Sequence, residues 1–251
     1  MAGVIINSDD FGYNPETNEA IEMAFDKGYI SSTSMLTNFN EGFADARTRI
    51  NNGSVSSAAV GIHLNLTEGT PLTSGIKTQS RFCDGRAFHG KARQTKMFRL
   101  NDEECKAVHN ELNAQLEQFK TLGFPPSHID SHHHVHTEWA VMSIVATLAK
   151  EHNIKKIRLS RNTGAGISKF KNMYKLIFNK MLVAKGFRCT QLMGDIDDYM
   201  NSGLPGNAIA EIMVHAVFTD GMLTDMDGKE LGKKLSQLSF DRSSLMNFSQ
   251  L

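Results

Sequence analysis

Short apolar segments alternate with helix-like segments along most of this 251-residue chain. The first apolar segment, residues 4–7, is followed by apolar side chains at helical spacing up to Gly28, and Asn14 and Pro15 are suited to begin that helix. Strands that alternate with helices indicate parallel strands joined by crossover helices. Further strands are expected at residues 32–36, 58–66, 156–160, 190–193 and 210–218, and further helices at residues 42–50, 102–122, 139–152 and 169–184.

Six or seven such strand–helix units in one chain predict an α/β fold, a distorted (β/α) barrel with parallel strands. We therefore expect a single domain over residues 1–251. Residues 69–100 contain scattered Gly, Pro, Ser and Thr and are expected to form an irregular loop or lid over the functional site. The segment after Gly228 is polar and is expected to be partly helical, and its role is left open.

The charge balance of the chain argues against several classes of function. The 27 basic and 27 acidic residues cancel, which disfavours a nucleic-acid binder that neutralises phosphates and disfavours electrostatic docking on a membrane. No apolar run approaches the roughly 18 residues of a membrane span, and the first residues lack the basic region of a signal peptide. Three isolated cysteines predict neither a zinc ribbon nor a disulfide framework. These features are typical of a soluble cytoplasmic protein.

Residues 128–136 contain five of the ten histidines in the chain, beside an aspartate. Histidine is the commonest metal ligand among side chains and a natural proton-transfer group. On a regular strand, His132 and His134 would share one face with their alternate neighbours, about 6.6 Å apart, and His133 would face away. Two ligands of one zinc-sized ion lie only about 3–3.5 Å apart. The cluster should therefore supply one ligand or two, and other strands must supply the rest.

Suitable partners fall at or just past the ends of other predicted strands. In β/α barrels the working residues lie at the C-terminal ends of the strands. One carboxylate and two imidazoles leave an open position for water, which is a familiar catalytic arrangement of metal ligands. Two adjacent aspartates can divide the work, one binding the ion and the other accepting a proton. The residues in question are Asp9, Asp10, His63, His132 and His215.

Each of these motifs, taken alone, also has an ordinary structural interpretation. Asp9 and Asp10 could form only the turn that leads into a helix, His63 could be a core histidine, and His215 could be structural. The histidine run could be an accidental metal-binding loop. The coincidence of all of them at the ends of separate strands favours a shared functional site. Three histidines without such surroundings are expected on the surface: His89, His109 and His152.

Three stretches of the sequence, residues 6–12, 61–72 and 126–136, resemble motifs of the YdjC-like carbohydrate deacetylases, the family of chitooligosaccharide deacetylases. The resemblance covers roughly the first 160 residues and implies a distorted β/α barrel related to polysaccharide deacetylases. It further implies removal of an acetyl group from an N-acetylglucosamine unit of a short β-linked oligosaccharide. The chain departs from the family near its C-terminus, where His215-Ala216 stands in place of the usual His-Pro dipeptide.

The same resemblance implies one divalent metal ion held by Asp10, His63 and His132, with Asp9 as the catalytic base. His215 is then our candidate for the general acid that protonates the leaving amine. Two imidazoles and a carboxylate suit zinc, whereas the family is commonly described with magnesium, so the identity of the ion is left open. Four neighbouring residues are expected to orient the ligands or to contact sugar hydroxyls: Asp130, His128, His134 and His136.

Two rival hypotheses remain at this stage. The chain could be a metal-dependent hydrolase of a non-sugar ester or amide, or a non-catalytic metal- or sugar-binding regulator on the same scaffold. The pair Asp9-Asp10 counts against the regulator, because binding alone does not need a spare base. The expected partner is a small acetylated oligosaccharide, with no nucleic acid and no membrane, and a homodimer is a plausible assembly.

Overall fold

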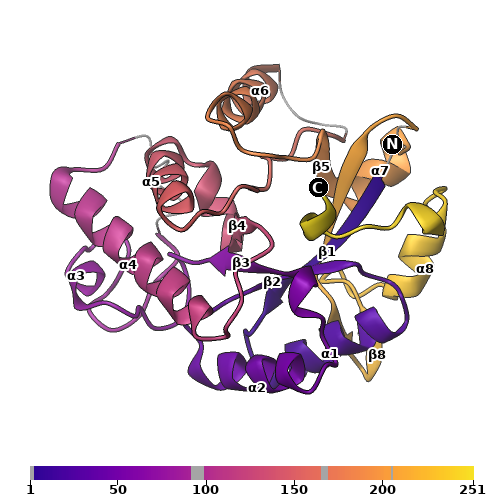
Figure 1. The fold of residues 1–251 in the computed structure, drawn as a ribbon, viewed down its shortest axis with the longest axis horizontal. Coiled ribbons are helices and arrows are strands. Elements are labelled where there is room, and N and C mark those ends of the chain that lie inside the picture. The colour runs from indigo at the N-terminus through magenta and orange to yellow at the C-terminus, as the bar shows by residue number, and fades with distance from the viewer. Residues whose placement is uncertain (1–2, 92–98, 165–168, 205) are drawn as a thin grey trace.

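The computed structural model describes residues 3–91, 99–164, 169–204 and 206–251, which form an α/β structure around a curled sheet (Figure 1). The sheet has six strands in the order β4-β3-β2-β1-β6-β5, and every neighbouring pair is parallel. The strands are β1 (Gly3–Phe11), β2 (Ser32–Met35), β3 (Val60–Leu64), β4 (Ile129–Ser131), β5 (Leu192–Asp195) and β6 (Ile209–Val214). Their interiors are almost wholly buried, as expected of parallel strands covered on both faces.

Isolated parallel bridges continue the strand pairing beyond β4, first to residues 156–157 and then to Arg188, near β5. Ile129 pairs with Ile157, and Lys156 pairs with Arg188, which lies shortly before β5. The expected distorted barrel of parallel strands is therefore confirmed. The strand expected at residues 156–160 is wrong in detail, because it forms only these single bridges. At its end both backbone groups of Ser160 bind the side chain of Asn179 instead of a neighbouring strand.

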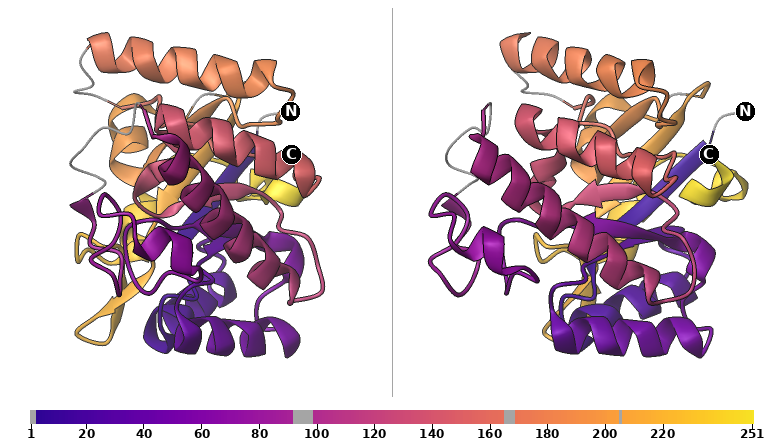
Figure 2. Two further views of the ribbon diagram at one scale, coloured as in Figure 1. Left: turned by 90° about the vertical axis from the view of Figure 1, so that its left-hand side faces the viewer. Right: turned by 60° about the vertical axis from the view of Figure 1, so that its left-hand side comes forward.

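Helices cover the outside of the sheet, and local sequence explains where the longer ones begin (Figures 1 and 2). The side chain of Asn14 accepts a hydrogen bond from the Thr17 backbone N–H at the start of α1, and Asn101 and Glu104 form a capping box at the start of α4. The helices are α1 (Pro15–Asp26), α2 (Asn40–Asn51), α3 (Ser74–Lys77), α4 (Asp102–Lys120), α5 (Trp139–Glu151), α6 (Lys169–Ala184), α7 (Ile196–Ser202) and α8 (Leu231–Ser236).

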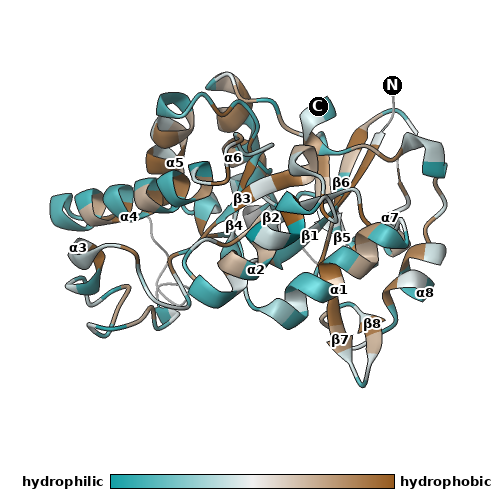
Figure 3. Cartoon of the chain, turned by 60° about the horizontal axis from the view of Figure 1, so that its bottom comes forward, coloured by the Kyte–Doolittle hydropathy of each residue, from teal (hydrophilic) through white to brown (hydrophobic). Residues whose placement is uncertain are grey.

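Apolar side chains concentrate along the strands and on the inward faces of the helices, while the outward face of α4 is polar (Figure 3). The described part of the segment expected to be a loop, residues 69–91, contains α3 and packs against α4. Ile76 and Phe82 of this segment are fully buried, and the Glu111 carboxylate accepts hydrogen bonds from the backbone of Leu72 and Thr73. Residues 92–98 lie outside the described residues, so the expectation of a lid stays a prediction. Among the described residues, each helix is too short or too polar to span a lipid bilayer.

The strand considered for residues 128–136 and the strand expected at residues 210–218 both end earlier than the sequence suggests. β4 stops at Ser131, and the backbone of His133 and His134 takes left-handed angles, with φ of 54° and 58°. The expectation that alternate histidines share one face is therefore wrong beyond β4. β6 stops at Val214, and the residues that follow form a separate antiparallel hairpin of β7 (Val217–Thr219) and β8 (Met222–Thr224).

The C-terminal segment closes the end of the barrel where the strands begin. The ring of Phe248 stacks on His128 at 3.7 Å between ring centroids, and Phe248 is fully buried. The Lys156 ammonium donates to the backbone carbonyls of Phe248 and Ser249. The stretch after Gly228, whose role the sequence leaves open, is therefore part of the core of the fold.

We expect Phe248→Ala to lower the free energy of unfolding by about 3–5 kcal/mol, because it removes a fully buried ring and leaves a cavity against His128. Urea unfolding measures the change. Met226→Ala, at a side chain that is 64% exposed, is the matched control and should change the stability by less than about 0.5 kcal/mol. A loss at Phe248 no larger than in the control would contradict this role for the C-terminal segment.

Candidate functional site

The candidate site lies at the end of the barrel where the parallel strands finish. Asp9 and Asp10 are close to the end of β1, His63 is near the end of β3, Asp130 is in β4 and His132 follows β4 directly. Residues far apart in the sequence therefore meet at one edge, as the C-terminal ends of parallel strands must.

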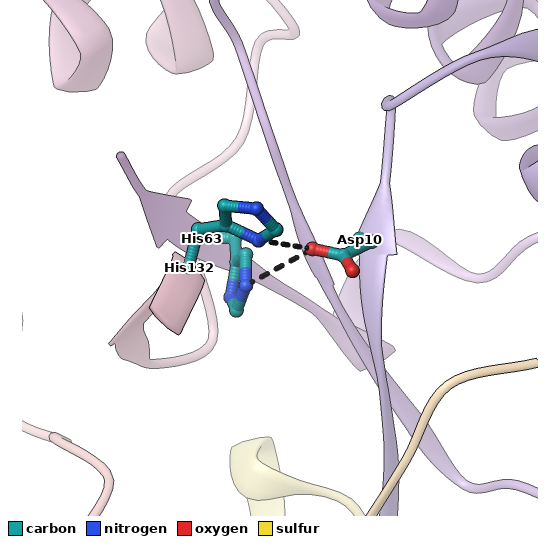
Figure 4. Close-up of side chains that lie close together, drawn as sticks. All are labelled: Asp10, His63 and His132. Atoms are coloured by element: carbon teal, nitrogen blue, oxygen red, sulfur yellow. Dashed lines mark hydrogen bonds and ion pairs between the residues drawn. The ribbon is translucent and has the colours of Figure 1, made fainter. Parts of the chain in front are cut away.

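Asp10, His63 and His132 form the centre of the site (Figure 4). Oδ1 of Asp10 lies 2.8 Å from Nδ1 of His132 and 3.3 Å from Nε2 of His63. One carboxylate oxygen and two imidazole nitrogens are thus close enough to bind a single cation. The structure therefore brings together the three residues that the family resemblance implied as ligands, and their binding of an ion stays a prediction.

The backbone near the end of β1 aims Asp10 toward the histidines. Asp10 has a φ of 73°, and the pairing of β1 with β2 changes register between Ser8 and Phe11. Aspartate tolerates the left-handed region better than most residues. Gly12, which also has a positive φ, donates its N–H to the Asn18 side chain at 2.6 Å and fixes the turn that follows. This irregularity releases the Asp9-Asp10 pair from the strict alternation of a strand.

A buried carboxylate fixes the orientation of His63. Its Nδ1 lies 2.7 Å from Oδ1 of Asp130, and the Ser34 hydroxyl donates to Oδ2 of the same carboxylate at 2.8 Å. Because Asp130 can only accept while it is ionised, Nδ1 of His63 is the donor and Nε2 is the nitrogen that faces Asp10, where it would hold an ion in place of its proton. Asp130 thus prepares His63 to act as a ligand.

The electrostatics of the site favour a cation. Burial lowers the pKa of His63, but the carboxylates of Asp130, Asp9 and Asp10 outweigh burial and raise that pKa to about 10. Burial raises the pKa of the Asp10 carboxyl, yet its hydrogen bonds with His132 and His63 hold the pKa well below the ordinary value. A proton on His63 therefore compensates negative charge that a divalent ion could compensate instead.

Arg158 holds Asp9 in place. Its Nη1 and Nη2 donate to Oδ2 and Oδ1 of Asp9 at 2.7 and 2.6 Å, and both side chains are buried. Burial raises the pKa of Asp9, but the charge of Arg158 outweighs it, so the net pKa is lowered. Oδ2 of Asp9 lies 4.0 Å from Nε2 of His63. The carboxylate is thus ionised and fixed beside the ligand cluster.

The sequence analysis did not single out Arg158, because the segment also contains Lys155, Lys156 and Arg161 and nothing in its pattern marks one cation as buried. Its guanidinium also binds Asp130 through Nη1 at 2.7 Å and Glu211 through Nε at 2.5 Å. Burial raises the pKa of Glu211 to about 7, in spite of Arg158.

His215 follows β6 and lines the same pocket as Asp9 and Asp10, a cavity of about 230 Å³. Its backbone N–H donates to Oδ1 of Asp225 at 3.0 Å. The next residue, Ala216, donates its N–H to the Ser8 hydroxyl at 3.1 Å, a bond that proline could not make. The departure from His-Pro thus ties this loop to β1.

The other expected residues lie around this centre. His128 is fully buried behind Asp130, with Nε2 3.8 Å from its Oδ2, and burial lowers the pKa of His128. Burial lowers the pKa of His134 to about 4 and that of His136 to about 3. The ring of His136 is bound to the Ser131 hydroxyl. His128 and His136 are therefore supporting residues behind the ligands, not part of the pocket lining.

The mouth of the pocket contains further residues that the sequence analysis passed over or treated as structural. Glu68 lies 3.5 Å from Nε2 of His132, and His133 lines the pocket with Tyr13. His133 stacks on His132 with ring centroids 3.9 Å apart, because its left-handed backbone turns it back. The position of Glu68, four residues beyond the end of β3, was the only hint in the sequence.

The stability of the ion-free protein should fall as the pH rises from 6.5 to about 10. The pKa of His63 in the fold is raised from 6.5 to about 10, so its protonation adds stability that is complete below pH 6.5 and is lost as the pH passes the raised value. Asp130→Asn removes the strongest contribution that raises this pKa. The free energy of unfolding of this variant should therefore fall less over the same pH range than that of the wild-type protein. Urea unfolding in chelator measures both slopes, and equal slopes would contradict the assignment.

Comparisons with known proteins agree with the motifs. The family model described as YdjC-like protein matches residues 3–241. A carbohydrate deacetylase of Vibrio parahaemolyticus is 34% identical over 151 residues, 60% of this chain and 57% of the relative. A carbohydrate deacetylase of Brevibacillus brevis is 29% identical over 229 residues, 86% of this chain and 82% of the relative. The matched part thus spans less than two thirds of the Vibrio relative.

A solved structure from Enterococcus faecalis V583, provisionally named a cellobiose-phosphate cleavage protein, superposes with a TM-score of 0.66. It is 22% identical in sequence, and the match covers 97% of this chain and 98% of that one. At this level of identity the likeness supports the fold alone.

Proposed function

Because this chain belongs to the YdjC-like family, we propose that it is a metal-dependent hydrolase that removes the N-acetyl group from N-acetylglucosamine units of short oligosaccharides such as chitobiose. Relatives named carbohydrate deacetylase support the reaction class. The observation that carries the proposal is the meeting of Asp10, His63 and His132 in one pocket, beside an ionised Asp9 that Arg158 clamps.

The donor atoms fit a divalent cation. Asp10 would supply an oxygen, and His63 and His132 would each supply a ring nitrogen, a set that suits zinc and leaves room for water and substrate. Magnesium, which prefers oxygen ligands, is the second candidate. When bound, the ion would act as a Lewis acid on the acetyl carbonyl and lower the pKa of a bound water.

Asp9 is suited to remove the proton from the attacking water. Its Oδ2 accepts a hydrogen bond from Arg158 and keeps a further lone pair on the side of His63. The clamp prevents rotation of the carboxylate, so the proton acceptor is positioned before the substrate arrives.

His215 is suited to complete the reaction. Water adds to the amide carbon, the C–N bond breaks, and the amine leaves with a proton that His215 donates. Its backbone is held by Asp225, and the adjacent Ala216 by Ser8, so the ring is carried on a fixed loop that lines the pocket. The products are acetate and a free sugar amine.

The size of the pocket agrees with a small acyl group. A cavity of about 230 Å³ is smaller than the roughly 300–1,000 Å³ of sites that enclose a whole drug-sized ligand. Val217 and Met226 supply apolar lining, and Tyr13 lies at the rim. We infer that the acetamido group enters the pocket while the rest of the oligosaccharide stays outside.

Asp9→Asn should reduce acetate release from N-acetylated chitobiose by about 10²–10⁴-fold, because it removes the proton acceptor. The three ion ligands are untouched, so the variant should still bind one equivalent of metal by elemental analysis. Glu117→Gln, at an exposed carboxylate on α4, is the control and should keep full activity. Full activity of the Asp9 variant would remove Asp9 from the mechanism.

Removing the ion should abolish the reaction. Treatment with chelator is expected to stop acetate release, and one equivalent of zinc or magnesium should restore it to the wild-type protein but not to His132→Ala. The measurement compares turnover before and after the addition. Undiminished turnover by thoroughly stripped protein would sink the metal-dependent mechanism.

A further inference from the structure

A second group of possible ligands lies at the mouth of the pocket: Glu68, His132 and His133. The two oxygens of Glu68 lie 3.5 Å from Nε2 of His132 and 3.6 Å from Nε2 of His133. His132 is only 7% exposed, and its Nε2 has no hydrogen-bond partner among the described residues. A buried polar atom without a partner requires an explanation.

The protonation of His132 follows from Asp10. The carboxylate of Asp10 accepts, so Nδ1 of His132 donates across the 2.8 Å contact. In the neutral ring, Nε2 then has a lone pair, and this lone pair faces the carboxylate of Glu68.

A similar argument applies to His133. The Thr67 hydroxyl donates its one proton to Oδ1 of Asn65 at 3.1 Å, so its oxygen accepts from Nδ1 of His133 at 2.9 Å. The Asn65 amide is oriented without ambiguity, because its Nδ2 donates to the Asn38 side-chain oxygen and to the Glu68 carbonyl. Nε2 of His133 is then the ring nitrogen on the side of Glu68, 3.6 Å from its carboxylate.

Three possible ligand atoms thus converge: a carboxylate oxygen of Glu68 and Nε2 of each of His132 and His133. We propose that they form a second, outer cation site at the mouth of the pocket, for a divalent ion of the zinc type. Two imidazole nitrogens and one carboxylate favour such ions over magnesium. The side chain of Glu68 is 41% exposed, so an ion can reach the site from solvent.

The outer site competes with the inner one, and this part of the inference rests on the proposed function. A neutral imidazole has a single lone pair, so His132 serves the inner ion through Nδ1 or the outer ion through Nε2, but not both. An outer ion therefore weakens the inner site. Metal in excess should inhibit the protein where one equivalent activates it.

Zinc titration calorimetry of the metal-stripped full chain tests the outer site separately from catalysis. His63→Ala disrupts the inner ligand set and leaves the outer one intact, so it should still bind one zinc ion. His63→Ala combined with Glu68→Gln should bind that ion at least tenfold more weakly. His63→Ala combined with Glu117→Gln loses a comparable exposed carboxylate elsewhere and should match His63→Ala alone. Asp10→Gly, which suits the positive φ, replaces His63→Ala if that variant does not fold.

The outcomes separate the two sites. If the inner-site variants bind no zinc, or if Glu68→Gln does not weaken their binding, the outer site is refuted and the proposed function is untouched. If Glu68→Gln in the wild-type background binds no zinc while His63→Ala binds one ion, the inner site fails and the outer site stands. If both sites exist in the wild-type protein, the Glu68→Gln variant should still bind the inner ion. Excess zinc should no longer inhibit this variant.

Discussion

The buried guanidinium of Arg158 is the interaction on which the rest of the site depends. It binds Asp9, Asp130 and Glu211, which lie on β1, β4 and β6, and all four side chains are buried. Removing one partner of such a network leaves an uncompensated charge and typically costs about 3–5 kcal/mol. The network therefore joins strands on different sides of the barrel. It also keeps the buried carboxylates of Asp9 and Asp130 ionised, although solvent does not reach them.

One cation does not balance this group of carboxylates, and the imbalance explains the chemistry at the end of the strands. Asp130 turns Nε2 of His63 toward Asp10, and Asp9 stays charged beside them. The remaining negative charge attracts either protons or a metal ion. The same arrangement that stabilises the ionised acids thus prepares a site for a Lewis acid, with a fixed proton acceptor next to it.

The sequence predicted the candidate site residues because each lies at or just past the end of an expected strand, and parallel strands align such ends. The family resemblance, not the strand pattern, implied which of them would hold an ion. Asp9, Asp10, His63 and His132 could be found in this way. Arg158 could not, because its partners come from three separate strands and its own strand is reduced to isolated bridges. The hairpin of β7 and β8 was missed since residues 210–218 are mostly apolar and predict one strand, although the chain turns after Val214.

The left-handed backbone at Asp10 and at His133 has a consequence for how an ion is acquired. The main chain near the ends of β1 and β4 aims these side chains toward the pocket, so the positions of the possible donor atoms are set by the fold. If an ion binds at such a site, we expect its identity to depend on which metals are available in the surrounding medium as much as on the affinity of the ligand atoms.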